Sequence, residues 1–290
     1  LINFHRSGIF LFYTLLLLLK ENRENGKFTH PWGTFFTTSD NTALFYRHWP
    51  ALQPGAKKVI VLFHRGHEHS GRLQHLVDEL AMPDTAFYAW DARGHGKSSG
   101  PRGYSPSLAR SVRDVDEFVR FAASDSQVGL EEVVVIAQSV GAVLVATWIH
   151  DYAPAIRGLV LASPAFKVKL YVPLARPALA LWHRLRGLFF INSYVKGRYL
   201  THDRQRGASF NNDPLITRAI AVNILLDLYK TSERIIRDAA AITLPTQLLI
   251  SGDDYVVHRQ QQIDFYQRLR SPLKELHLLP GFYHDTLGEW

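Results

Sequence analysis

The sequence predicts an α/β protein with a doubly wound, mostly parallel sheet. Most of its predicted strands are short apolar runs without alternation, which is typical of strands buried on both faces. Helical patterns separate these runs, for example at residues 108–122 and 259–269, and alternating strands and helices indicate a parallel sheet. The predicted parallel strands lie at residues 59–63, 85–90, 132–137, 158–162, 247–250 and 275–279.

An antiparallel hairpin precedes these strands. Residues 34–38 and 43–49 alternate between apolar and polar side chains, and the turn formers Ser39, Asp40 and Asn41 lie between them. Alternation interrupted by such a turn is typical of a β-hairpin. We therefore expect these residues to form the first two strands.

A long insertion between residues 165 and 242 interrupts this alternation of strands and helices. It contains helical patterns at residues 170–188 and 215–240, with prolines at 173 and 177. We interpret residues 165–240 as a helical cap inserted after the sixth strand. The core then comprises residues 31–164 and 241–290.

The positive charge of the chain lies in this insertion. Residues 164–240 hold 13 Lys and Arg against 5 Asp and Glu, whereas the whole 290-residue chain has a net charge of +7. A basic and apolar cap suits peripheral contact with an anionic membrane; a solvated basic face is the plainer alternative. A nucleic-acid partner is not expected, because no recognition motif accompanies the charge. The apolar residues are Trp182, Leu185, Leu188, Phe189 and Phe190.

A serine at a strand-to-helix turn carries the strongest chemical signal. The β-branched run at residues 133–136 leads into Ala137-Gln138-Ser139-Val140-Gly141, and an apolar helical pattern follows. This is the pattern of a nucleophile elbow, which presents the serine oxygen beside free backbone N–H groups. Ser98, in Gly96-Lys97-Ser98-Ser99-Gly100, fits the literal motif better but is not followed by a helix. We expect Ser139 to be the nucleophile and Ser98 to be a loop serine.

An acid and a histidine follow in the chain. Asp254 comes after the strand at residues 247–250, and His284 comes after the next strand. A loop at the carboxyl end of a parallel strand is where a triad carboxylate belongs. Asp253 is the alternative acid, because the loop boundary is defined only to within a few residues. We expect Ser139, Asp254 and His284 to form a catalytic triad with His284 as general base.

Metal and thiol chemistry have little support. The chain has no cysteine, which excludes a disulfide, a thiol nucleophile and a thiolate metal site. His64, His67 and His69 resemble a metal cluster, but no carboxylate ligand has a clear place beside them. We therefore expect no metal and no cofactor.

The N-terminal residues are apolar without matching a targeting segment. Residues 8–19 end in five leucines before Lys20, and this run is shorter than the ~20 residues of a transmembrane helix. Its length suits the core of a signal peptide, but no small-x-small cleavage site follows. We interpret residues 1–30 as an apolar leader, either membrane-leaning or mis-assigned.

Several stretches of the chain match one family pattern. They are residues 63–72, 91–98, 137–142, 159–164 and 212–215, together with the loops of Asp254 and His284. Across residues 34–288 the chain resembles the α/β-hydrolase superfamily, most of all its monoacylglycerol lipase, lysophospholipase and serine aminopeptidase S33-like branch. Residues 35–69 also resemble the hydrolase half of bacterial bifunctional α/β-hydrolase/methyltransferase proteins.

The resemblance implies an α/β-hydrolase fold and an oxyanion hole. Gly66 and Val140 would supply its two backbone N–H donors. Arg65 stands where the family has glycine, so we expect a cation beside the oxyanion hole, binding an anionic substrate group or pointing to solvent. Gln138 is the second candidate substrate-binding residue. The family normally closes with a helix after the catalytic histidine, so we expect this chain to lack its last helix.

The expected function is that of an enzyme of lipid metabolism. It would be a serine hydrolase that cleaves esters of single-chain lipids, such as a monoacylglycerol or a lysophospholipid, through an acyl-enzyme. A peptidase or an acyltransferase would use the same triad. A ligand-binding relative without turnover is a third alternative, for which Arg65 is the best support. We expect a cytoplasmic protein, with membrane association through the cap as the open alternative.

Overall fold

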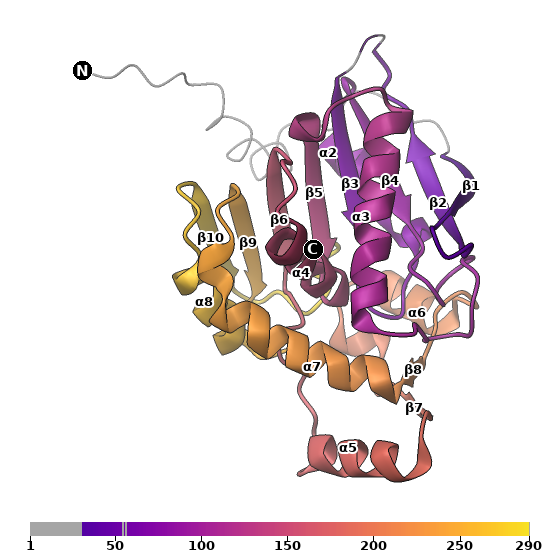
Figure 1. The fold of residues 1–290 in the computed structure, drawn as a ribbon, viewed down its shortest axis with the longest axis vertical. Helices are drawn as coiled ribbons and strands as arrows, with labels where there is room; N and C mark the ends of the chain where they lie inside the picture. Colours follow the sequence, from indigo (N-terminus) through magenta and orange to yellow (C-terminus); the bar gives the residue numbers. More distant parts are fainter. Residues whose placement is uncertain (1–30, 54, 56, 290) are drawn as a thin grey trace.

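The computed structural model describes residues 31–53, 55 and 57–289, and the predicted leader at residues 1–30 lies outside them (Figure 1). Its centre is an 8-stranded sheet in the order β1-β2-β4-β3-β5-β6-β9-β10. β2 pairs antiparallel with β1 and β4, and the other neighbours pair in parallel. This confirms the predicted mostly parallel sheet and its opening hairpin. The strands are β1 (Trp32–Thr37), β2 (Ala43–Trp49), β3 (Lys58–Phe63), β4 (Thr85–Trp90), β5 (Val133–Gln138), β6 (Gly158–Ala162), β9 (Thr246–Ser251) and β10 (Lys274–Leu279).

Helices cover both faces of the sheet (Figure 1). One face packs against α3 (Leu108–Asp125), α4 (Val140–Tyr152) and α8 (Arg259–Arg268), and the other packs against α2 (Gln74–Leu80). β4, β5, β6 and β9 are therefore buried along their whole length, which explains why their sequences do not alternate. Short 3₁₀ helices lie at Ser70–Leu73, Leu130–Glu132, Gly197–Tyr199 and Ala239–Ala241.

Helix α4, which follows the predicted elbow, is buried from Gly141 to Ile149. It packs against β5, α3 and α7. Because it is covered on several sides, its sequence is apolar almost all round. It is 13 residues long, shorter than the ~20 residues that span a bilayer. Across the part of the chain that the structure describes, no helix combines the length and the hydropathy needed to cross a membrane.

The cap lies between β6 and β9 and is less helical than expected. Its elements are α5 (Ala175–Arg186), β7 (Phe190–Asn192), α6 (Arg204–Asn212), β8 (Ala219–Ala221) and α7 (Val222–Arg237). β7 and β8 pair antiparallel, so the predicted helix at residues 215–240 is wrong over β8 and begins only with α7. The periodicity of one segment cannot reveal pairing with a distant one. Figure 1 shows α7 between α5 and the sheet.

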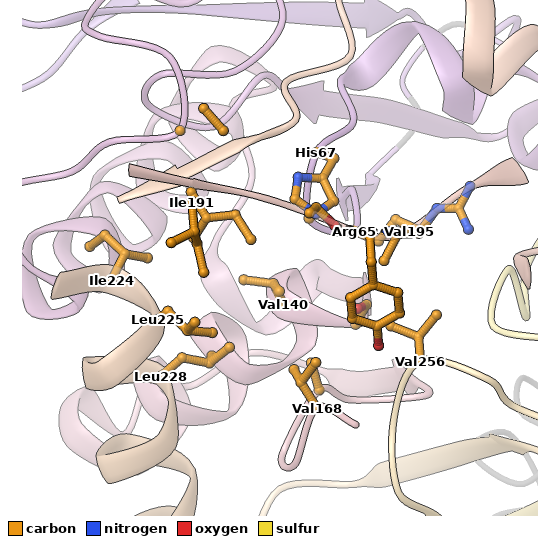
Figure 2. A pocket seen from close by; sticks show the side chains of 18 of the residues that line it. Arg65, His67, Val140, Val168, Ile191, Val195, Ile224, Leu225, Leu228 and Val256 are labelled. Carbon is orange, nitrogen blue, oxygen red and sulfur yellow. Dashed lines mark hydrogen bonds between the residues drawn. The ribbon is translucent and has the colours of Figure 1, made fainter. Parts of the chain in front are cut away.

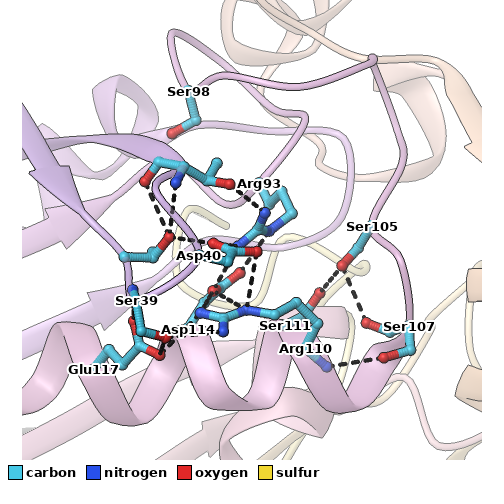
Figure 3. A network of polar contacts seen from close by, with 12 residues as sticks. Ser39, Asp40, Arg93, Ser98, Ser105, Ser107, Arg110, Ser111, Asp114 and Glu117 are labelled. Atoms are coloured by element: carbon cyan, nitrogen blue, oxygen red, sulfur yellow. Dashed lines mark hydrogen bonds and ion pairs between the residues drawn. The ribbon is translucent and has the colours of Figure 1, made fainter.

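A buried polar network fixes the loop after β4 to helix α3 (Figure 3). The Arg93 guanidinium makes two hydrogen bonds of 2.9 Å to the Asp114 carboxylate. It also donates to Asp40 in the β1–β2 turn at 3.0 Å, and this hydrogen bond holds the pKa of Asp40 well below its usual range. The loop that carries His95 and Ser98 is therefore held rigidly against the core.

Candidate active site

Ser139 occupies a strained turn between strand and helix. β5 ends at Gln138 and α4 begins at Val140, and Ser139 between them has φ 56° and ψ −117°. A positive φ in a residue other than glycine costs energy and is common at active sites. The turn also needs Gly141, because a Cβ there would lie 2.5 Å from the backbone oxygen of His64. The local sequence thus builds the elbow that the motif predicted.

Three predicted residues from distant segments meet at this turn. The Nε2 atom of His284 lies 2.8 Å from Ser139 Oγ, and its Nδ1 atom lies 2.7 Å from Asp254 Oδ2. All three side chains are buried. The other carboxylate oxygen of Asp254 accepts hydrogen bonds from the backbone N–H groups of Val256 and Val257 at 2.7 and 2.9 Å.

These contacts fix the ionisation state of Asp254 and the tautomer of His284. Burial raises the pKa of Asp254, but the attraction of His284 and the hydrogen bonds outweigh it, so this pKa lies below its ordinary value. An ionised carboxylate can only accept, so Nδ1 of His284 carries the proton. Its Nε2 lone pair is then free to accept the Ser139 hydroxyl proton. This arrangement can generate a nucleophilic serine oxygen.

The two alternative residues lie elsewhere. Asp253 is exposed, and no hydrogen bond among the described residues joins its carboxylate to His284. Ser98 is buried away from the cavity, where its hydroxyl donates to the backbone oxygen of Asp91 at 2.5 Å and accepts from Phe45 N at 2.8 Å. The geometry therefore groups Asp254 and Ser139 with His284, and gives Ser98 a structural place.

Gln138 does not contact the cavity, contrary to its predicted substrate-binding role. Its amide is buried and donates to the backbone oxygen of His284 at 3.0 Å. It therefore holds the His284 loop against the end of β5. The sequence placed Gln138 next to the nucleophile but could not show that its side chain turns toward the loop after β10.

Arg65 is buried and paired, so the expectation that it points to solvent is wrong, whereas binding of a substrate anion stays a prediction because Arg65 also lines the cavity. Its side chain is 3% exposed, and Nη2 lies 2.7 Å from Glu68 Oε1 and 3.3 Å from Asp285 Oδ2. Glu68 also accepts from Arg72 at 2.6 Å. The guanidinium points away from the centre of the cavity (Figure 2). Arg65 thus neutralises buried acids in the loops after β3 and β10.

Asp285, the residue after His284, was missed by the sequence reasoning, as was its partner Arg206. Burial raises the pKa of Asp285, but the charges of Arg65 and Arg206 outweigh it and hold this pKa below its usual range. Arg206 lies on cap helix α6 and pairs with Asp285 across 79 positions of sequence. No local pattern signals a pair so far apart in the chain.

Gly66 and Val140 lie close to each other beside the serine. Both line the same cavity as Ser139, and a Cβ at Gly66 would lie 3.1 Å from the Val140 side chain. Among the described residues, no hydrogen bond uses the backbone N–H of Gly66 or Val140. Both donors therefore remain available for an oxygen placed next to Ser139.

A mostly apolar cavity of about 170 Å³ opens beside Ser139 and His284 (Figure 2). Its walls come from the core and from the cap, which meet around the nucleophile. Figure 2 shows the aliphatic side chains directed into the same space from several elements. They include Val140, Val168, Ile191, Val195, Ile224, Leu225, Leu228 and Val256.

The three clustered histidines have separate partners. His64 donates through Nδ1 to the Arg65 carbonyl at 2.7 Å and accepts from Ala92 N at 3.0 Å. His67 Nδ1 lies 2.6 Å from the backbone oxygen of Thr217, and His69 lies 2.9 Å from an Asp213 oxygen. In the described ranges, no group of three or more His, Cys, Asp or Glu side chains could hold a metal ion.

The chain matches one protein family over most of its length. The family model described as serine aminopeptidase, S33, matches residues 54–290. The monoacylglycerol lipase of Mycolicibacterium smegmatis is 27% identical, with 85% of this chain and 87% of the relative covered. The human monoglyceride lipase is also 27% identical, with 85% and 81% covered. An uncharacterized abhydrolase domain-containing protein of Dictyostelium discoideum is 28% identical, and this chain spans 27% of its length.

Solved structures share the fold. A soluble variant of the Saccharomyces cerevisiae monoglyceride lipase, in complex with a substrate analog, aligns with a TM-score of 0.79 and 18% identity over 92% of each chain. The monoacylglycerol lipase of Paleococcus ferrophilus aligns with a TM-score of 0.73 and 21% identity, over 90% of this chain and 93% of its own. At these identities the likeness shows the fold alone.

Proposed function

Because the chain belongs to the serine aminopeptidase S33 family of α/β-hydrolases, in the branch of the monoacylglycerol lipases, we propose that it cleaves esters of single-chain lipids. At the coarser level it is a hydrolase of the lipase and esterase type. The observation that carries the finer proposal is the hydrogen-bonded series from Asp254 through His284 to Ser139. This series ends at a mostly apolar cavity. Monoacylglycerols and lysophospholipids are the proposed substrate classes.

In the proposed mechanism, Ser139 Oγ attacks the ester carbonyl carbon while His284 Nε2 takes the hydroxyl proton. Asp254 stabilises the imidazolium that forms. The backbone N–H groups of Gly66 and Val140 stabilise the oxyanion, and a donor of this kind contributes on the order of 3 kcal/mol. His284 then gives its proton to the leaving alkoxide, and an acyl-enzyme remains. Water, deprotonated by His284, attacks the acyl carbon and releases the acid.

The cavity supports an acyl chain as the group bound next to Ser139. Aliphatic side chains such as Val168 and Leu228 line its walls. Each methylene of an acyl chain that is buried against them contributes about 0.8 kcal/mol to binding. The volume of about 170 Å³ is below the ≈ 300–1,000 Å³ that is common for ligand pockets. A short or medium chain therefore fits within the cavity, and a longer chain extends beyond it.

Labelling with a fluorophosphonate probe tests the proposal. Such a probe reacts with an activated serine, so the wild-type chain should be labelled and Ser139→Ala should not. A panel of acyl esters and aminoacyl amides then separates an esterase from a peptidase. Absence of both labelling and ester cleavage in the folded wild-type protein would refute the proposed function.

We also propose that α5 brings the enzyme to anionic lipid surfaces. None of its residues is buried, and Leu181, Trp182 and Leu185 are 60%, 50% and 68% exposed. Arg184 and Arg186 lie on the same helix, and the Arg186 guanidinium lies 5.0 Å from the centre of the Trp182 ring. An amphipathic basic helix of this kind suits the headgroup region of a membrane.

Co-sedimentation with phosphatidylcholine vesicles containing phosphatidylglycerol tests this contact. The wild-type chain should pellet with the vesicles, and Leu185→Ser should reduce the bound fraction. Leu278→Ser is the control, because Leu278 is an exposed apolar residue on β10, outside the cap. Equal binding by the two variants would contradict a role for α5.

A further inference from the structure

Two histidine rings border the cavity beside the nucleophile. His67 lies in the loop after β3 and His95 in the loop after β4, and both line the cavity together with Ser139 and Gly66. Figure 2 shows His67 on the side of the cavity opposite Val168. These rings provide polar groups in a wall that is otherwise mostly apolar. The mechanism proposed above for ester cleavage uses neither ring.

The hydrogen bonds of His67 fix its tautomer. Its Nδ1 atom lies 2.6 Å from the backbone oxygen of Thr217 in the cap, and a carbonyl oxygen can only accept, so Nδ1 carries the proton. Burial lowers the pKa of His67 to about 4, so the ring is neutral near pH 7. Its Nε2 atom is then an acceptor, and no described residue donates a hydrogen bond to it.

His95 repeats this arrangement. Its Nδ1 atom lies 2.9 Å from the backbone oxygen of Arg93, so it donates there, and burial lowers the pKa of His95 to about 3. The centre of the His64 ring lies 5.7 Å away, and burial lowers the pKa of that ring as well. Arg93 is itself held by Asp114, so the His95 ring is firmly placed. Its Nε2 atom is a second acceptor without a described donor.

We propose that Nε2 of His67 and Nε2 of His95 accept hydrogen bonds from free hydroxyl groups on the alcohol half of the ester. This inference rests on the proposed esterase function. Two neutral acceptors beside the nucleophile complement O–H donors. An alkyl alcohol would displace water from both acceptors and leave them unpaired, which is costly in a buried site. The chain thereby selects esters of polyols over esters of simple alcohols.

The backbone of His67 makes a clean variant available. His67 has φ 73°, a conformation in which asparagine is tolerated and glycine is unstrained. In His67→Asn the amide nitrogen can still donate to Thr217 from about the position of Nδ1, while the cavity acceptor is lost. In His67→Gly the ring is lost and the backbone strain is relieved. Neither change needs the fold to rearrange.

The test compares 2,3-dihydroxypropyl butanoate with propyl butanoate, two esters that differ only in two hydroxyl groups. We expect the wild-type enzyme to prefer the dihydroxy ester by about tenfold or more in kcat/KM, which corresponds to the cost of unpaired buried acceptors. His67→Asn, His67→Gly and His95→Asn should each lower this preference, mainly by slowing cleavage of the dihydroxy ester. His258→Asn is the matched control, because His258 precedes α8 and does not line the cavity.

Each outcome decides the inference. A preference near one in the wild type, or an unchanged preference in all three cavity variants, overturns it while leaving the esterase intact. Failure of the wild-type chain to cleave either ester overturns the proposed function, and the inference with it. Melting temperatures of the variants show whether each protein is folded. If His67→Asn fails to fold, His67→Gly and His95→Asn still give the answer.

Discussion

The guanidinium of Arg206 in the cap pairs with the carboxylate of Asp285, the residue that follows His284. Further contacts join the same segments: for example, Asp285 N donates to Leu200 O at 2.7 Å, and His202 N donates to the Glu289 carboxylate at 3.1 Å. The cap and the His284 loop are therefore attached side by side. The position of the imidazole depends on that of the cap.

Removing the Arg206 charge should loosen this attachment. We expect Arg206→Met to lower kcat/KM for a butanoate ester by roughly tenfold and the free energy of unfolding by about 2 kcal/mol, because Asp285 keeps only Arg65 as a buried partner. Steady-state kinetics and urea unfolding measure the two effects. Arg204→Met, an exposed change on the same helix, should have little effect. Equal losses in the two variants would contradict the coupling.

The two serines should separate activity from stability. Ser139→Ala should abolish ester cleavage, because it removes the proposed nucleophile. Ser98→Ala should keep most of the activity but lower the free energy of unfolding by about 1–3 kcal/mol, because it leaves the backbone groups of Asp91 and Phe45 without their partner. Activity assays and urea unfolding measure both. Activity retained in Ser139→Ala would contradict the elbow assignment.

The neighbouring acids provide a second matched pair. Asp254→Asn should reduce kcat by a factor that can reach ~10⁴, because an amide at this position favours the wrong imidazole tautomer. Asp253→Asn should have little effect, because Asp253 is exposed. Steady-state kinetics on one ester is sufficient. Small and equal losses would remove Asp254 from the proposed triad.

The acyl chain should show the effect of the cavity. In a series of glycerol esters that begins with acetate, we expect kcat/KM to rise by up to about fourfold per methylene. The rise should slow once the cavity of about 170 Å³ is filled. Long-chain monoacyl esters should still be better substrates than acetate. A flat or falling series would indicate a small-ester hydrolase.

The two cavity histidines should make stability depend on pH. The pKa of His67 is lowered to about 4 and that of His95 to about 3, whereas an unfolded histidine titrates near 6.5. Below about pH 6.5 the unfolded chain binds protons that the folded chain does not, so stability should fall as the pH falls from about 6.5 toward 4. Each histidine can contribute up to about 1.4 kcal/mol per pH unit.

Urea unfolding at about pH 7 and about pH 5 measures this slope. His67→Asn should reduce the slope, because it removes one of the two groups. The matched change His258→Asn should reduce it less, because the pKa of His258 is lowered by a burial that is only partial. If the slope is the same in the wild type and in His67→Asn, His67 takes up its proton as readily in the folded chain as in the unfolded chain, which would contradict the prediction.

The sequence by itself determined the features that depend on neighbouring residues. The strand-turn-helix at Ser139 follows from a β-branched run, a small-residue turn and an apolar helix. Each buried strand of the sheet was visible as an apolar run. The loops of Asp254 and His284 were located because each follows such a strand. Local backbone preferences, and the burial of a strand on both faces, are visible in the residue pattern of a few consecutive positions.

Only the tertiary structure decided which side chains meet. Asp253 and Asp254 are adjacent in sequence, yet only Asp254 turns toward His284. The sequence left open whether Arg65 binds a substrate anion or points to solvent, and it did not show that the loop after β10 brings Asp285 to it. The antiparallel pairing of β7 and β8 within the cap was equally invisible. Such contacts join residues far apart in the chain, and they depend on how whole elements pack, which no short window of sequence contains.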